Sequence, residues 1–301
     1  MGSLRQSRRS ARIAQYRHTV EGGTVESLVE ALGYEADSRL LIISADQLGS
    51  THAATAGGLS AVREGAATTG TVMMPGPWSR HAVDRIEADE DFGVHLTLNA
   101  ELDCFRWGPL TSAPSLLDGD GGFPRTVADL WDHADADEVR RECRAQLERA
   151  TLWGLDATHL STHLNALQQR PEFFDVLLDI AIEAGLPLRL EGPAAQATAG
   201  FPFRDLARDE GVITPDHFRL VRGGAEAHFS AVLDNLTPGV TVVAFEPAIA
   251  AEEIRAIDPS ATARMNDLAV LTDRSLPARI AESGAQLIGF AALRDIQRSH
   301  Q

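Results

Sequence analysis

The chain has 301 residues, of which 44% are hydrophobic and 23% are charged, a composition typical of a globular protein with a sizeable core. The formal net charge of -16 disfavours nucleic acid and anionic membranes as partners, because both are negatively charged themselves. The two cysteines lack a CxxC spacing, which excludes a zinc knuckle and disfavours a disulfide framework.

The N-terminus and the apolar runs of the sequence indicate the cellular location of the protein. No apolar run approaches the length of a membrane span, and the N-terminus lacks the apolar segment of a signal peptide. We therefore expect a cytoplasmic protein that acts on a small-molecule substrate. The Arg-rich residues 1–24 are typical of a flexible polar tail, and residues 25–301 are predicted to form a single domain.

From residue 28 onward, patterns typical of helices and strands alternate. Strands are predicted at 40–44, 71–74, 92–98, 157–162, 188–190, 240–245 and 286–290. Helices are predicted at about 28–32, 52–64, 79–88, 137–153, 171–184, 223–236 and 276–283, with one more after the last strand. A long loop at about 99–125 and an irregular, cap-like insertion at 191–221 interrupt this alternation.

Strands that alternate with helices predict an α/β fold whose parallel sheet is covered by helices. About seven strands are compatible with a closed or distorted (β/α) barrel and with an open, doubly wound sheet. No GxGxxG follows the first strand, so a dinucleotide site is not supported.

Four ionisable residues stand at or near the ends of predicted strands, where parallel α/β folds gather their reacting groups. They are Asp46, His95, His163 and Glu246. Three of them also have a structural interpretation, since Asp46 is suited to capping a helix, His95 to the core, and Glu246 to an ordinary loop. Two imidazoles and a carboxylate would suit a divalent cation that activates water for hydrolysis of an amide or ester.

The chain resembles the YdjC-like (ChbG/HpnK) carbohydrate deacetylases from about residue 28 to 294. The matching stretches are LLIISADQLGSTHAA, FGVHLTLNAE, RWGPL, THLSTHLNALQQRPEFF and AGLPLRL. The resemblance implies a distorted (β/α) barrel, removal of an acetyl group from an N-acetylated sugar, and a divalent metal. It also suggests a homodimer.

The resemblance assigns roles to individual positions. Asp46 corresponds to a catalytic base, and His95 and His163 correspond to metal ligands. The family's second aspartate, a metal ligand, is replaced here by Gln47. Its HxDSH segment reads His159 to His163, with Ser161 in place of the aspartate, and its late His-Pro reads Glu246-Pro247.

These departures weaken the expected metal site. An amide oxygen is a poorer ligand for a hard cation than a carboxylate, and a lost supporting aspartate typically costs about 10–100-fold in metal affinity or activity. We therefore expect Mg, Mn or Zn to be held weakly or not at all, by His95, His163 and Gln47, or by the two histidines with Glu246. Glu246 is also a candidate catalytic acid.

Three functional interpretations remain open at the level of the sequence. The first is a hydrolase of the deacetylase type, with Arg106, Trp107 and His159 binding the substrate. The second keeps the scaffold for metal-independent acid/base chemistry by Asp46 and Glu246, as in an isomerase, lyase or cyclase. The third is a non-catalytic binding protein.

Overall fold

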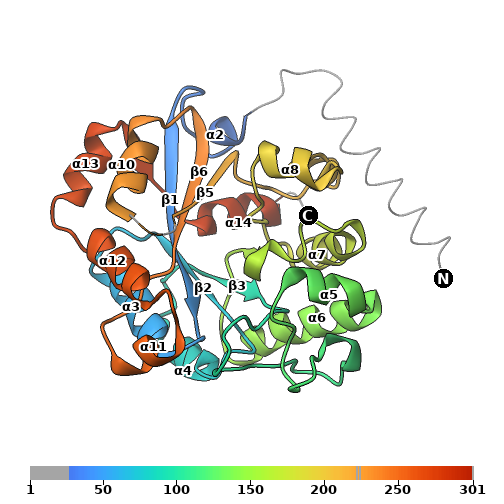
Figure 1. The fold of residues 1–301 in the computed structure, drawn as a ribbon. Coiled ribbons are helices and arrows are strands. Elements are labelled where there is room, and N and C mark those ends of the chain that lie inside the picture. The colour runs from blue at the N-terminus through green and yellow to red at the C-terminus, as the bar shows by residue number, and fades with distance from the viewer. Residues whose placement is uncertain (1–26, 222, 224, 300–301) are drawn as a thin grey trace.

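The computed structural model describes residues 27–221, 223 and 225–299, so the predicted tail at 1–24 lies outside the described part. A parallel sheet of seven strands organises the chain in the order β4-β3-β2-β1-β6-β5, and β7 pairs with the start of β1. The strands are β1 (Arg39–Leu48), β2 (Thr69–Val72), β3 (Phe92–Leu96), β4 (Leu160–Thr162), β5 (His217–Leu220), β6 (Gly239–Phe245) and β7 (Ala285–Leu287). The sheet curls into a half-barrel (Figure 1), which confirms the predicted α/β fold and is consistent with a distorted barrel.

The two central strands are apolar because both of their faces are covered. β1 and β6 pair in register from Arg39↔Gly239 to Ala45↔Phe245, and every residue of β6 is buried. Side chains of β1 alternate between two cores, so that Leu41 packs with α10 (Ala225–Asp234) and α12 (Ala261–Leu271), whereas Leu40 packs with α14 (Phe290–Ser299). The last helix therefore fills the hollow of the curled sheet (Figure 1).

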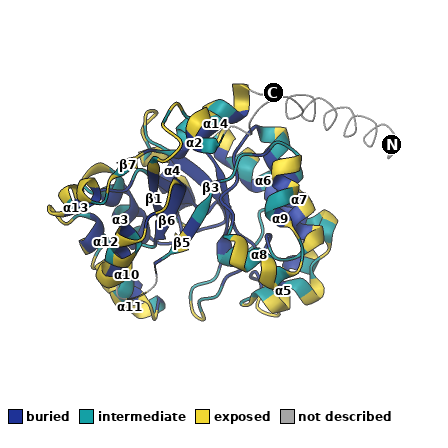
Figure 2. Ribbon diagram, turned by 90° about the horizontal axis from the view of Figure 1, so that it is seen from above, coloured by how far each residue is buried: buried dark blue, intermediate teal, exposed yellow. Residues whose placement is uncertain are grey.

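Two groups of helices flank the strands, as the view from above shows (Figure 2). One group contains α3 (His52–Arg63), α11 (Glu252–Ile257), α13 (Leu276–Glu282), α10 and α12. The other contains α5 (Val127–His133), α6 (Ala136–Leu152), α7 (Pro171–Ala184), α8 (Pro193–Ala199) and α9 (Phe203–Asp209). The short helices α2 (Leu28–Ala31) and α4 (Ser79–Arg85) complete the described fold, in which no helix is long and apolar enough to cross a membrane.

The structure differs from the sequence-based prediction at three places that matter for the site. β1 continues to Leu48, so Asp46 and Gln47 lie within the strand and not after it. The segment 191–221, expected to be irregular, contains α8, α9 and the edge strand β5, whose polar residues hide it from a search for apolar runs. Residues 188–190 form only an isolated bridge, between Leu160 and Leu188, and not a strand.

Candidate active site

Asp46 is held by a buried ion pair on β1. Its Oδ1 accepts hydrogen bonds from Ser44 Oγ (2.6 Å) and Arg189 Nη1 (2.7 Å), and its Oδ2 lies 2.7 Å from Arg189 Nη2. Burial raises the pKa of Asp46, but the Arg189 guanidinium outweighs this effect and the pKa falls to about 2. Asp46 is therefore ionised, and its charge is balanced by Arg189. Such a carboxylate is a weak proton acceptor at neutral pH.

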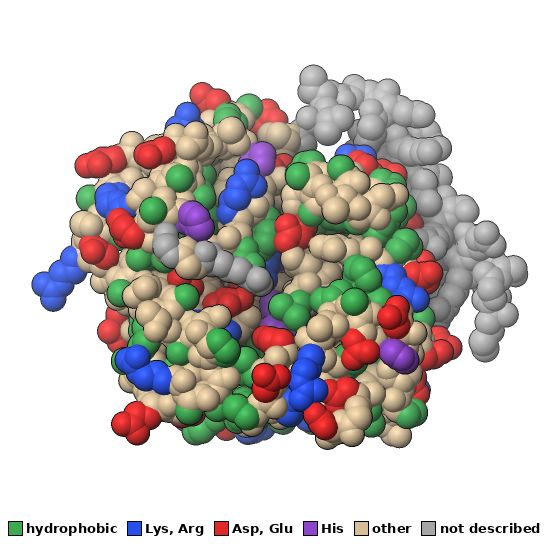
Figure 3. Space-filling model, in the orientation of Figure 1, with side chains coloured by type: hydrophobic (Ala, Val, Ile, Leu, Met, Phe, Trp, Pro, Cys, Tyr) green, Lys and Arg blue, Asp and Glu red, His purple; other side chains and the backbone are tan. Residues whose placement is uncertain are grey.

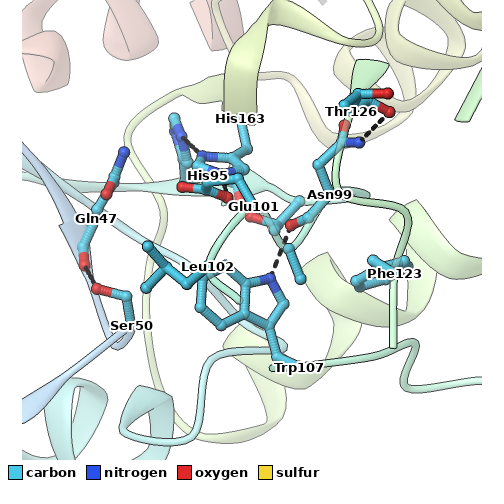
Figure 4. A network of polar contacts seen from close by, with 12 residues as sticks. Gln47, Ser50, His95, Asn99, Glu101, Leu102, Trp107, Phe123, Thr126 and His163 are labelled. Carbon is cyan, nitrogen blue, oxygen red and sulfur yellow. Dashed lines mark hydrogen bonds and ion pairs between the residues drawn. The ribbon is translucent and has the colours of Figure 1, made fainter. Parts of the chain in front are cut away.

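His95 and His163 lie together at the carboxyl ends of neighbouring strands. His95 is on β3, and His163 follows β4 directly, in the 3-10 turn His163–Asn165. The backbone makes this placement through a left-handed conformation at Leu164 (φ 50°) and Asn165 (φ 55°), which turns the chain sharply after the strand. His95 Nε2 and His163 Nδ1 are 3.4 Å apart, and the ring centroids are 5.4 Å apart (Figure 4).

The two imidazoles form the middle of a longer hydrogen-bonded chain. Ser161 Oγ lies 2.7 Å from His95 Nδ1, and His163 Nε2 lies 2.8 Å from Glu101 Oε2. Ser161 is fully buried, whereas the Glu101 side chain is 31% exposed, so the chain leads from the interior to the edge of the site. Burial lowers the pKa of His95 to about 3, despite the opposing charge of Asp46, so this ring is neutral at physiological pH.

A second cluster joins β1, the loop after β6 and α12. Gln47 Nε2 donates to Glu246 Oε1 (2.8 Å), and Gln47 Oε1 accepts a hydrogen bond from Arg264 Nη2. The guanidinium also lies 3.7 Å from Glu246 Oε2 and donates from Nε to Asp258 (2.6 Å). The charge of Arg264 helps to lower the pKa of Glu101, after the larger effects of burial, which raises it, and His163, which lowers it. The two clusters are therefore close enough for their charges to interact.

Close packing sets the position of Glu246. Gly57 of α3 lies against the backbone of Ala248, where a Cβ atom would come within 2.5 Å of Ala248 Cα. The Ala248 amide also donates to the Arg264 carbonyl (3.1 Å), and the Glu246 amide donates to Asp267 Oδ2 (3.0 Å). These contacts fix the loop after β6 against two helices and leave 19% of the Glu246 side chain exposed.

The long loop covers the histidines. Glu101 comes from this loop, and Trp107 lies beside His163, with ring centroids 6.4 Å apart and Nε1 donating to the Asn99 carbonyl (2.8 Å) (Figure 4). Trp107 is only 5% exposed, so it packs as part of the wall. The Arg106 guanidinium is bound within the loop, to Asp118 and to the Phe123 carbonyl. Substrate binding by Arg106 and Trp107 therefore stays a prediction.

His159 lies elsewhere in the interior. Its ring stacks on Phe290 of α14 with centroids 3.8 Å apart, and Thr158 Oγ1 lies 3.1 Å from its Nδ1. Gly93 on the neighbouring strand leaves room for this ring, because a Cβ there would lie 2.5 Å from His159 Nδ1. His159 is fully buried, so these contacts give it a packing role, and the substrate-binding role predicted for it has no support in the geometry.

The described residues do not fit the divalent metal that the resemblance implies. Within residues 27–299, apart from 222 and 224, no three His, Cys, Asp or Glu side chains are placed to hold a metal ion. The Gln47 amide oxygen, which would have to serve as the third ligand, is bound to Arg264, and the amide nitrogen is bound to Glu246.

The two histidines, Asp46 and Glu246 were predicted from the sequence, but the residues that contact them were not. Arg189 and Arg264 received no role, and neither did Glu101. Arg189 and Glu101 nevertheless lie within the matching stretches AGLPLRL and FGVHLTLNAE, so both were open to detection. Arg264 lies on α12, a helix for which the sequence analysis made no prediction.

A curled parallel sheet with ionisable groups at its strand ends is the arrangement found in enzymes of the (β/α)-barrel type. Figure 3 shows histidine and acidic side chains near the middle of one face of the molecule. The model of the family described as "YdjC-like protein" matches residues 40–282, and the chain belongs to this family.

Similar proteins share most of the chain. A carbohydrate deacetylase from Geobacillus stearothermophilus is 32% identical over 84% of this chain and 97% of its own length. One from Thermus thermophilus is 39% identical over 51% of this chain and 54% of its own length. A crystal structure from Enterococcus faecalis, described as a putative cellobiose-phosphate cleavage protein, is 25% identical, with a TM-score of 0.72 over 85% of this chain and 99% of that one.

Proposed function

We propose that this protein is a hydrolase that removes the acetyl group from an N-acetylated sugar or a similar small carbohydrate. The family membership and the relatives named carbohydrate deacetylases support a hydrolase of this type. The structural observation that carries the proposal is the presence of two sets of ionisable side chains at the carboxyl end of the sheet. These are the chain Glu101–His163–His95 and the Glu246 carboxylate beside Arg264.

The proposed reaction needs a group that accepts a proton from water and returns it to an amine. Water adds to the acetyl carbonyl carbon, the C–N bond breaks, and the products are acetate and a free amino sugar. Glu246 is suited to this task because its side chain is 19% exposed and is oriented by the hydrogen bond from Gln47 Nε2. Arg264 lies 3.7 Å from its Oε2, farther than the 2.7 Å contacts by which Arg189 neutralises Asp46. It takes the proton from water and passes it to the departing amine nitrogen.

The other ionisable residues support this reaction in different ways. His95 and His163 form a path along which a proton can move to the partly exposed Glu101. Asp46 fixes Arg189 by a two-point ion pair, and in this proposal it is a positioning residue rather than the base. We further propose a cytoplasmic protein, a homodimer, that acts on a small molecule and binds neither nucleic acid nor membrane. The net charge of -16 supports the last two points, because nucleic acids and anionic membranes are negatively charged themselves.

The test is release of acetate and of a free amine from N-acetylglucosamine and from N,N′-diacetylchitobiose. We expect both products in equal amounts, and Glu246→Gln should lower the rate by about 10²–10⁴-fold, the usual contribution of a general acid/base. Glu252→Gln, an exposed acid on α11, is the matched control and should leave the rate unchanged. If the folded wild-type protein releases no acetate, the proposal that it deacetylates these sugars is wrong.

A further inference from the structure

We infer that Arg264 takes the place of a bound divalent cation in this site, as a positive charge supplied by the chain itself. The inference goes beyond the proposed reaction, because it concerns what the site binds when no substrate is present. It rests on the contacts of Arg264 with Gln47, Glu246 and Asp258.

The guanidinium occupies the side of Gln47 that a cation would need. The amide oxygen is the only atom of this side chain able to coordinate a metal, and it accepts its hydrogen bond from Arg264 Nη2. Arg264 is 7% exposed, and its Nη1 has no partner among the described residues. A metal at the Gln47 oxygen would therefore meet a buried positive charge at hydrogen-bonding distance, and the two would repel each other.

The charges around Arg264 make the guanidinium a stable occupant. Asp258 accepts from Nε at 2.6 Å, Glu246 lies 3.7 Å from Nη2, and Asp267 stands one helical turn away on α12. These carboxylates surround the position with negative charge, which one guanidinium with a fixed, multi-pronged geometry offsets in part. Removal of Arg264 would leave the same negative charge without a cation.

A second observation at His95 agrees with this inference independently. A histidine that binds a metal usually donates its other ring N–H to a carboxylate or carbonyl, which keeps the metal-binding nitrogen unprotonated. Here the partner of His95 Nδ1 is the hydroxyl of Ser161, which can itself donate. Ser161 can then donate to His95 Nδ1, His95 Nε2 to His163 Nδ1, and His163 Nε2 to Glu101. In this arrangement His95 Nε2 carries a proton, so it has no free lone pair for a metal.

The experiment measures metal binding directly, by calorimetric titration of the apo protein with Zn²⁺ and with Mn²⁺ and by metal analysis after dialysis. The variants are Arg264→Gln with Gln47→Asp, and the same pair with Asp258→Asn so that Asp258 does not remain as a buried carboxylate without its arginine. Aspartate tolerates the left-handed backbone at position 47 (φ 69°), so the change fits the strand. Arg255→Gln with Gln286→Asp, both exposed, is the matched control.

We expect no stoichiometric binding by the wild type or the control, and binding on the order of 100-fold tighter in both designed variants, because a repelling charge is removed and a carboxylate ligand is added. His163→Ala in the designed background should abolish it. Stoichiometric wild-type binding that His163→Ala removes would overturn the inference, and so would folded variants that gain no binding. Neither measurement requires enzymatic activity. The result on metal binding therefore stands whether or not the proposed deacetylation is observed.

Discussion

Asp46 on the central strand β1 and Arg189, which follows the bridge between Leu188 and β4, meet as an almost completely buried pair. Their side chains are 4% and 6% exposed, and the guanidinium also packs over the Phe218 ring, 5.2 Å from its centroid. Such a pair is costly to break, because removal of one partner leaves an uncompensated charge in the interior. The pair therefore constrains both the stability and the electrostatics of the site.

Replacement of Arg189 tests the importance of this pair for stability. We expect Arg189→Met to lower the free energy of unfolding by about 3–5 kcal/mol, the usual cost of an unpaired buried charge. Chemical denaturation at neutral pH measures this quantity. Arg219→Met, an exposed arginine on β5, should change it by less than about 0.5 kcal/mol. A loss of equal size in both variants would contradict a special role for Arg189.

The same pair predicts a pH dependence with a definite sign. The pKa of Asp46 in the folded protein, about 2, lies below its ordinary value of 3.8. The pair therefore contributes its full stability above about pH 4, and this contribution is lost as the pH falls through about 2. Asp46→Asn should flatten the acid limb of the stability curve over this range. An acid limb identical in wild type and variant would rule out the assignment.

Among the elements, α6 fixes the long loop that covers the histidines. Glu142 is fully buried on this helix and accepts hydrogen bonds from the backbone amides of Leu110 (3.0 Å) and Thr111 (2.9 Å). Gln146, one turn further, donates to the carbonyl of Thr97 (2.8 Å) at the end of β3. The helix thus ties both the start and the middle of the loop to the sheet.

We expect Glu142→Ala to loosen this loop, because two partly buried backbone N–H groups lose their acceptor. The loss of stability should be about 2–4 kcal/mol, and amide hydrogen exchange should rise in residues 99–125 more than in α7. Glu148→Ala, on the exposed face of the same helix, is the control and should leave exchange in the loop unchanged. Uniformly faster exchange across the whole chain would show that Glu142 does not act on the loop.

The elements also show why part of the fold could be predicted from the sequence. β1 and β6 are buried on both faces and therefore appear as unbroken apolar runs, whereas β5 lies at the edge of the sheet and carries polar residues. The continuation of β1 to Leu48 was not predictable from apolar residues, because Asp46 and Gln47 interrupt the run. Helix α7 matches its predicted bounds because Pro171 and Gly185 mark both ends.

At the scale of the whole molecule, the candidate site depends on contacts between segments that are distant in the sequence. Arg189 is 143 residues from Asp46, and Arg264 is 217 residues from Gln47. Residue types and strand ends predicted the histidines and acids, but the arginines that set the charge of the site depend on the curl of the sheet and the position of α12. The residue that determines whether a metal fits could therefore not be named from the sequence.

The most direct test of the account is acetate release from N,N′-diacetylchitobiose by the wild-type protein, measured with and without an excess of chelator. We predict that the folded protein releases acetate at the same rate in both conditions, because Arg264 supplies the positive charge of the site. The rate should fall in Glu246→Gln under both conditions. Activity that disappears in chelator and returns with added Mn²⁺ or Zn²⁺ would contradict the account.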